Sequence, residues 1–359
     1  MKTYTAAVIG LSHISQARAP LPEALSAALP MPRSHVAAYA AHPRIKLVGA
    51  CDLLLEPITR FEQTWRDAHP DTKIYTDYRE MIARERPDIV SVVTPDDQHA
   101  DIVVAVARAG VPAIWCEKPL ATTLEDADRM IDAVEANKTL MLVSHTRRWI
   151  PLFHRLRELV TKRPYGALKL VSARLFYSRA MLFRNGTHAV DMLTFLAGAP
   201  AEWVIGELED GFDHFNRYLG DGGRAVESEP SANALIRFTN GVRGSLLMQK
   251  GAIQSNAYEL VFENAVVRSA DDGRILVERL DGPPGTVTQA GIPVTQVLGY
   301  PEWTAEAELA TVSELVDALD KGTPPPLSTP RAARATLAIL LGILESHARG
   351  NAKVMINNR

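Results

Sequence analysis

The first 145 residues alternate short apolar runs with segments of helical periodicity, and this alternation constrains the fold more than any other feature. Strands that alternate with helices are typical of parallel βαβ units, in which each crossover helix covers the sheet. The pattern therefore predicts an α/β fold with a doubly wound parallel sheet. The candidate strands are 5–9, 46–51, 73–75, 89–94, 113–117 and 139–144, with helical segments at 58–69, 99–109 and 124–136.

After residue 145 the pattern changes to strands joined by hairpin signals, of which Thr239-Asn240-Gly241 is the clearest. A chain of 359 residues with 47% hydrophobic residues is long enough for two packed domains. We expect an α/β domain at 1–145 and a second, α+β domain at 146–359. Its candidate strands are 168–176, 232–238, 242–249 and 258–262, with an exposed loop at 221–230 and a final helix at 330–349.

The charge balance favours small-molecule partners. A formal net charge of -3 gives no basic field for nucleic acid. The longest apolar helical stretch, at 335–344, is too short to span a bilayer, and no signal-peptide pattern is present at the N-terminus. We expect a soluble cytoplasmic protein with no nucleic-acid or membrane partner.

The first strand ends in a weakened form of the glycine-rich dinucleotide fingerprint, Gly10-Leu11-Ser12-His13-Ile14-Ser15. Only Gly10 is kept, but the two serines are small enough for the turn, and their hydroxyls can donate to a phosphate. Asp52 ends the second strand, where a carboxylate accepts hydrogen bonds from an adenosine ribose and repels a 2′-phosphate. This favours NAD over NADP, although Arg60 is a cation that can compensate.

Residues 16–34 form an insertion between this loop and its usual helix. Four prolines bracket an alanine- and leucine-rich segment at 23–29, which predicts a short helix between breakers. A lid, an oligomer contact and a packed surface excursion all remain open as roles for it.

The cysteines and histidines predict neither a disulfide nor a metal site. With the usual strand order 3-2-1-4-5-6, Cys51 and Cys116 end strands that lie about 14 Å apart, so we expect free thiols in a reducing compartment. The ten histidines show no ligand-type spacing with cysteines or carboxylates, and the chain has no HExxH.

The stretch Ile114-Trp115-Cys116-Glu117-Lys118-Pro119 places charge at the carboxyl end of a strand, where open α/β sheets bind ligands. A partly desolvated amine beside a carboxylate can have its pKa moved towards neutrality, which suits proton transfer. The alternative is an ordinary surface pair of Glu117 and Lys118.

An ordered set of motifs resembles the Gfo/Idh/MocA family of oxidoreductases. The set comprises Thr94-Pro95 with His99, then 117–119, Thr146-Arg147-Arg148-Trp149 and 186–191, in the family's order and spacing. The resemblance implies a Rossmann domain, a second domain with an open, mostly antiparallel sheet, and a nicotinamide between them. It also implies a homodimer or homotetramer formed through the outer face of that sheet.

The resemblance also assigns roles. Lys118 is expected to handle the proton, Glu117 to contact the nicotinamide ribose, and Pro119 to carry a cis peptide. His188 is expected to share the substrate hydroxyl, and the catalytic Asp191, on the same helical face, to hold a sugar hydroxyl or orient the imidazole. The alternative for His188 is a satisfied core histidine. Cofactor contacts are expected from Gly10, Ser12, His13, Ile14, Asp52, Thr94, Pro95, His99, Glu117, Lys118 and Arg147, and substrate contacts from Lys118, Arg148, Arg184, Asn185 and His188.

Arg184 departs from the family pattern, because many active members have an aspartate at this position. With Arg147 and Arg148 it is expected either to bind an anionic group of the substrate or to form salt bridges within the second domain. The main hypothesis is an NAD(P)-dependent dehydrogenase of a sugar, cyclitol or related polyol. An NAD-assisted glycosidase and a non-catalytic dinucleotide-binding sensor remain as alternatives.

Overall fold

The computed structural model describes residues 2–17, 34–220, 225–252, 255–269, 274–279, 294–297 and 307–359. The chain divides into two compact units, which are described separately below. Unit 1 comprises Met1–Trp149, Leu219–Asp221 and Thr304–Arg334, and unit 2 comprises Ile150–Tyr218, Gly222–Trp303 and Ala335–Arg359.

Unit 1 is built on a six-stranded sheet with the order β3-β2-β1-β4-β5-β6. Every neighbouring pair in it is parallel. The predicted doubly wound sheet and its strand order are therefore confirmed. The strands are β1 Tyr4–Ile9, β2 Ile45–Cys51, β3 Lys73–Tyr75, β4 Ile89–Val92, β5 Ala113–Cys116 and β6 Leu140–Val143.

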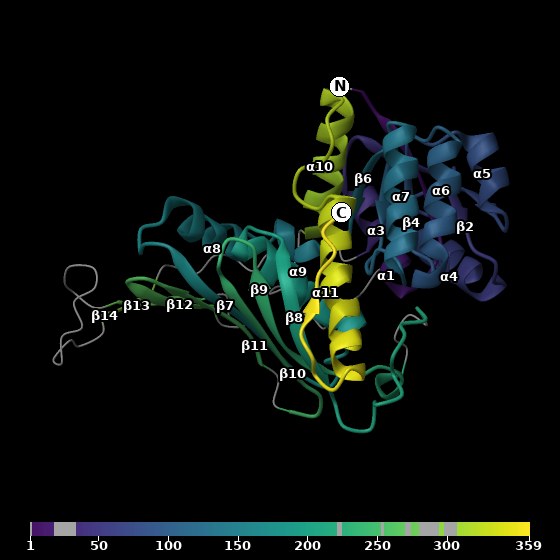
Figure 1. The fold of residues 1–359 in the computed structure, drawn as a ribbon. Helices are drawn as coiled ribbons and strands as arrows, with labels where there is room; N and C mark the ends of the chain where they lie inside the picture. Colours follow the sequence, from purple (N-terminus) through teal and green to yellow (C-terminus); the bar gives the residue numbers. More distant parts are fainter. Residues whose placement is uncertain are drawn as a thin grey trace, which may run out of the picture. The chain divides into compact units, whose positions relative to one another are not determined.

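The central strands β4 and β5 are buried along their whole length, because helices cover the sheet on both faces. Figure 1 shows α5, α6 and α7 side by side, with α6 packed against its neighbours. The helix predicted at 58–69 begins at Leu55 instead, because Pro57 falls in the first turn, where its missing N–H costs nothing. The helices are α1 His13–Gln16, α3 His35–Ala41, α4 Leu55–Trp65, α5 Tyr78–Glu85, α6 His99–Arg108, α7 Leu124–Ala136 and α10 Ala307–Lys321.

The predicted insertion at 16–34 lies outside the described residues for 18–33. Its two described flanks meet, since the Ser34 hydroxyl donates to the Ala17 carbonyl at 2.9 Å. Gln16 is anchored next to them by donating to the Leu11 and Pro57 carbonyls at 2.6 and 3.0 Å. Residues 17 and 34 therefore lie side by side in unit 1.

Unit 2 is built on a nine-stranded sheet with the order β14-β13-β12-β11-β7-β10-β9-β8-β15. Among the described strand pairs of this second sheet, only β7 and β10 are parallel. The expected mostly antiparallel sheet is therefore confirmed. The predicted hairpin between β9 and β10 is present, with Gly241 at φ +89°. The strands are β7 Leu168–Phe176, β8 Ala201–Leu208, β9 Ala232–Phe238, β10 Arg243–Gln249, β11 Ser255–Phe262, β12 Ala265–Ser269, β13 Ile275–Arg279, β14 Val294–Val297 and β15 Val354–Met355.

Helices cover one face of this second sheet. Helix α9, Thr187–Ala197, packs on β7 and β10 and contacts α8, Pro151–Lys162 (Figure 1). Helix α11, Pro330–Ala348, lies against β8, where a Cβ on Gly206 would approach Ile343 Cγ2 to 2.7 Å. The opposite face exposes Leu235 and Leu247 by 56% and 46%.

The prediction of an exposed loop at 221–230 is wrong at its C-terminal end. Residues 221–224 lie outside the described part, but Glu229 is only 1% exposed. Its carboxylate accepts hydrogen bonds from the backbone N–H groups of Phe183 and Arg184. A charged side chain is buried here because it satisfies backbone donors.

Both cysteines are buried free thiols, as expected. Burial raises the pKa of Cys51 to about 12, and the nearby Asp52 carboxylate adds to this effect. In the described part of the chain, every helix is too short or too polar to cross a membrane.

Candidate active site

The structure brings several predicted site residues of unit 1 together at one edge of its sheet. Gly10, Asp52, Thr94 and Glu117 each follow the last residues of a strand, and parallel strands end on the same side. The backbone ladder continues there, because Gly10 N donates to Cys51 O and Glu117 N donates to Val92 O, at 2.8 and 2.9 Å. This is the edge at which open α/β sheets bind ligands.

Gly10 makes the tight turn that the sequence predicts. Its φ is +89°, and a Cβ at this position would lie 2.6 Å from Val93 O, so only glycine fits. The Asp52 carboxylate accepts from Leu11 N at 2.7 Å and from Leu54 N at 2.9 Å, which ties the end of β2 to the turn. Residues 12–14 are exposed at the start of α1, where the first N–H groups of a helix lack partners within it.

His99 lies beneath the ends of β4 and β5. It is fully buried, with Nδ1 3.0 Å from Pro119 O and Nε2 3.1 Å from Thr94 O. Because carbonyl oxygens only accept, both ring nitrogens must carry protons. Burial by itself lowers the pKa of His99, but the Cys116 sulfur, Asp96 and the Pro119 carbonyl together raise it to about 10. A cationic imidazole therefore joins the Thr94 and Pro119 segments.

Glu117 is a buried carboxylate, 8% exposed, held from several sides. His35 Nε2 lies 3.0 Å from Glu117 Oε1, and Lys118 N donates to Oε2 at 3.2 Å. Burial by itself raises the pKa of Glu117, but His35, Lys118 and Ser144 lower it to about 2. Glu117 is therefore an anion at neutral pH.

The contacts of Glu117 continue into unit 1 as a chain of buried polar groups. His35 Nδ1 lies 2.9 Å from Ser91 Oγ, which lies 2.6 Å from the Tyr39 hydroxyl. The His35 ring stacks on Trp115 with centroids 3.6 Å apart, and Trp115 Nε1 donates to Ser144 Oγ at 2.7 Å.

Sequence reasoning missed this chain of His35, Ser91, Tyr39 and Ser144. One signal was available, because Ser91 is the single polar residue inside the apolar run 89–93. A buried hydroxyl in a central strand requires a hydrogen-bond partner.

Lys118 is the second residue after β5 and is partly exposed, whereas Glu117 and Pro119 on either side are buried. The Lys118–Pro119 peptide bond is cis, as expected. Arg148 is only 6% exposed and donates to the Leu327 carbonyl at 2.7 Å, while Arg147 is half-buried. Substrate binding by Arg148 stays a prediction.

Unit 2 positions the remaining predicted residues around the start of α9. Arg184 and Asn185 belong to a π-helical turn, Leu182–Gly186, and His188 lies partly exposed in the first turn of α9. Asn185 Nδ2 donates to Arg179 O at 2.6 Å. Asp191 is fully buried and accepts from Thr336 Oγ1 at 3.2 Å. The expectation that His188 and Lys118 act on one substrate involves both units and stays a prediction.

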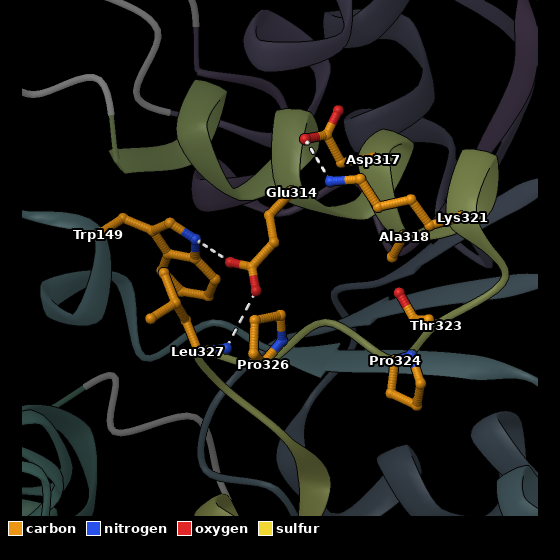
Figure 2. Close-up of a pocket in the computed structure, with 9 residues that line it drawn as sticks. All are labelled: Trp149, Glu314, Asp317, Ala318, Lys321, Thr323, Pro324, Pro326 and Leu327. Carbon is orange, nitrogen blue, oxygen red and sulfur yellow. Dashed lines mark hydrogen bonds and ion pairs between the residues drawn. The ribbon is translucent and has the colours of Figure 1, made fainter.

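Unit 1 also contains a pocket of about 540 Å³ formed by α10, Trp149 and the proline-rich segment 323–327 (Figure 2). Glu314 joins these parts, because it accepts from Trp149 Nε1 at 2.5 Å and from Leu327 N at 3.0 Å. None of the predicted catalytic, cofactor-binding or substrate-binding residues lines this pocket.

Residues 6–145 match the family model GFO_IDH_MocA, described as an oxidoreductase family with an NAD-binding Rossmann fold. This region of the chain belongs to the Gfo/Idh/MocA oxidoreductase family. The likeness to this family that the motifs indicated is thereby confirmed for the matched residues.

Two curated relatives of this chain are named as dehydrogenases. The D-apiose dehydrogenase of Paraburkholderia graminis is 31% identical over 180 residues, which are 46% of this chain and 47% of that protein. The myo-inositol 2-dehydrogenase of Thermotoga maritima is 28% identical over 192 residues, or 50% and 55% of the two chains. The matched stretches thus span about half the length of these relatives.

A solved structure shares the Gfo/Idh/MocA fold over the whole chain. Levoglucosan dehydrogenase, solved with NADH and L-sorbose, is 18% identical, covers 100% of both chains and has a TM-score of 0.76. At this identity the likeness shows the fold alone.

The residues of the Gfo/Idh/MocA region fit a nicotinamide dinucleotide. The Gly10 turn, the start of α1 and Asp52 supply the expected donors and acceptor, and Thr94 Oγ1 is a buried atom with no hydrogen-bond partner among the described residues. Such an atom at a strand end is ready for a ligand. In the described part, no group of three or more His, Cys, Asp or Glu side chains is arranged to hold a metal ion.

Proposed function

We propose that this protein is an NAD(P)-dependent dehydrogenase that oxidises a secondary hydroxyl of a sugar, cyclitol or related polyol. The observation that supports this proposal most directly is Lys118, a partly exposed residue that follows the buried Glu117 anion just after β5. It lies at the ligand-binding edge of a fold whose family is NAD-binding. The names of the curated relatives support a polyhydroxylated substrate.

The bound nicotinamide supplies the hydride acceptor, and the residues of this chain supply binding and proton transfer. The Gly10 turn and the N–H groups of residues 12–14 hold the pyrophosphate. Asp52 accepts from the adenosine ribose, and Glu117 accepts from the nicotinamide ribose. Lys118 takes the proton from the substrate hydroxyl as the C–H bond breaks, so it acts as the general base.

The unit 2 residues bind the substrate in this proposal. His188 shares the reacting hydroxyl with Lys118, and Asp191 orients the His188 imidazole or holds a further hydroxyl of the substrate. Arg184 and Asn185 lie on the turn before His188, and a guanidinium there suits a substrate with a carboxylate or phosphate.

NAD is the preferred cofactor in this proposal. The Asp52 carboxylate carries a negative charge where NADP has its 2′-phosphate. Arg60, the cation expected to offset this charge, is paired with Glu56 on the same helix. The expected measurement is a lower dissociation constant for NAD than for NADP in a fluorescence titration.

Replacing Lys118 tests the mechanism. Lys118→Met keeps the length of the side chain and removes the amine, so we expect NAD binding to remain and turnover to fall about a hundredfold or more. The assay follows reduced-cofactor absorbance across a panel of sugars and inositols. Lys73→Met, at an exposed position on β3, is the control and is expected to turn over like the native protein. Equal turnover by Lys118→Met removes Lys118 from the mechanism.

The same panel separates the alternatives. Tight NAD binding with no turnover of any polyol favours the sensor. Cleavage of a glycoside with no net NAD consumption favours the NAD-assisted glycosidase.

We further propose that the protein is a homo-oligomer located in the cytoplasm. The uncovered face of the unit 2 sheet combines Leu235 and Leu247 with an ion-pair ladder, in which Arg268 contacts Glu259 and Glu278 at 2.6 and 2.5 Å. A face that mixes exposed leucines with charges suits pairing with a second copy. Two buried free thiols suit a reducing compartment.

A further inference from the structure

His35 contacts Glu117 from a different part of unit 1. It lies in the first turn of α3, is 1% exposed and is 82 residues from Glu117 in the sequence. Its ring is fixed by stacking on Trp115 at 3.6 Å. An imidazole with this burial and stacking cannot rotate away from Glu117 without breaking the packing.

Hydrogen-bond accounting places a proton on His35 Nε2. The Glu117 carboxylate only accepts when ionised, so the 3.0 Å contact requires an N–H at Nε2. At the other nitrogen, the Ser91 hydroxyl can donate to Nδ1 and accept from the Tyr39 hydroxyl. Each proton of Tyr39, Ser91 and His35 then has one acceptor, and the chain ends on Glu117.

We propose that His35 is a positioning residue, which holds the Glu117 carboxylate in the orientation that receives the nicotinamide ribose. This proposal rests on the proposed dehydrogenase function. His35, the Lys118 N–H and the Ser144 hydroxyl all hydrogen-bond to the Glu117 carboxylate from the protein side. The remaining lone pairs of a fixed carboxylate are then available to a ligand hydroxyl without further ordering of the side chain.

The proton location is tested first, in the full-length protein without cofactor. In protein labelled with ¹⁵N-histidine, two-bond nitrogen–proton correlations report the ring state, and His35→Gln assigns the signals. A proton on Nε2, in the neutral ring or in the imidazolium, supports the proposal. A neutral ring protonated on Nδ1 alone overturns it. This readout does not depend on enzyme activity.

The effect on cofactor binding is tested with three variants. His35→Leu removes the donor to Glu117, and we expect the dissociation constant and the KM for NAD to rise about tenfold or more, with a smaller change in kcat. His35→Gln keeps an N–H near the position of Nε2, so a rise of about threefold or less is expected. Thr72→Val is the control, because it removes a buried hydrogen bond to Leu47 O with no link to Glu117.

Unchanged NAD affinity in a folded His35→Leu protein overturns the proposal, as does an equal loss in His35→Gln. If His35→Leu does not fold, Ser91→Ala takes its place, because it removes the partner of Nδ1 and leaves the ring. A rise of about twofold to threefold in the dissociation constant is then expected, and no rise counts against the proposal. If the native protein binds NAD but oxidises no polyol, the proposed function fails. The histidine correlations and the dissociation constant for NAD still decide the role of His35 in that case.

Discussion

His99 is a single residue whose positive charge is stabilised by its hydrogen-bond partners. Its two nitrogens face two carbonyl oxygens, and its pKa is raised from 6.5 to about 10. A group whose pKa is higher in the folded state stabilises the fold fully below the unfolded pKa. That contribution is lost as the pH rises through the folded pKa. The stability of the native protein should therefore fall between about pH 6.5 and 10.

The measurement is urea unfolding at a series of pH values across this window. The slope for one proton is at most about 1.4 kcal/mol per pH unit. His99→Gln is expected to be less stable at pH 6.5 and to lack this part of the slope. His13→Gln, at an exposed position, is expected to keep it. A native protein whose stability is flat over this range would show that His99 is not cationic.

The turn between β1 and α1 is the element on which cofactor binding depends in our proposal. Gly10→Ala brings a Cβ to 2.6 Å from Val93 O at φ +89°, so the turn must shift. We expect a loss of about 1–3 kcal/mol from backbone strain, a further loss from the clash, and weaker NAD binding. Gly110→Ala is a matched control, because its φ is +76° and nothing lies within 4 Å of the added Cβ.

Urea unfolding and NAD titration of the two variants provide the comparison. Gly110→Ala is expected to lose only the part of the unfolding free energy that comes from backbone strain. It should bind NAD normally. Equal losses in stability and unchanged NAD affinity in Gly10→Ala would show that the contact with Val93 has no consequence.

At the same scale, the sequence predicted the strands, their order and the turn, because apolar periodicity and glycine placement are local signals. The buried chain from Tyr39 to Glu117 was not predicted, since it joins groups 82 residues apart, at His35 and Glu117. Glu229 was assigned to an exposed loop for the same reason, because its partners Phe183 and Arg184 lie 46 and 45 residues away. A charged residue near glycines is typical of a surface loop, and the sequence does not show which backbone groups will hydrogen-bond to it.

For the whole molecule, the uncovered face of the unit 2 sheet predicts the oligomeric state. Leu235→Arg with Leu247→Arg places two cations on this face, so we expect a native dimer or tetramer to become a monomer. The measurement is light scattering coupled to size-exclusion chromatography. Leu53→Arg, at a residue 78% exposed in unit 1, serves as the control and should leave the assembly intact. A monomeric native protein, or a double variant of unchanged mass, contradicts the proposal.

The contact between Ala17 and Ser34 affects how much homologous chains can differ in length at this position. Because the Ser34 hydroxyl donates to Ala17 O, residues 17 and 34 are neighbours in space, and loop closure between them costs little more when the joining chain is longer. The contact lies beside Gln16, whose amide bonds to Leu11 next to the Gly10 turn. Homologous proteins could thus differ in length between these two positions while the parallel sheet stays as it is.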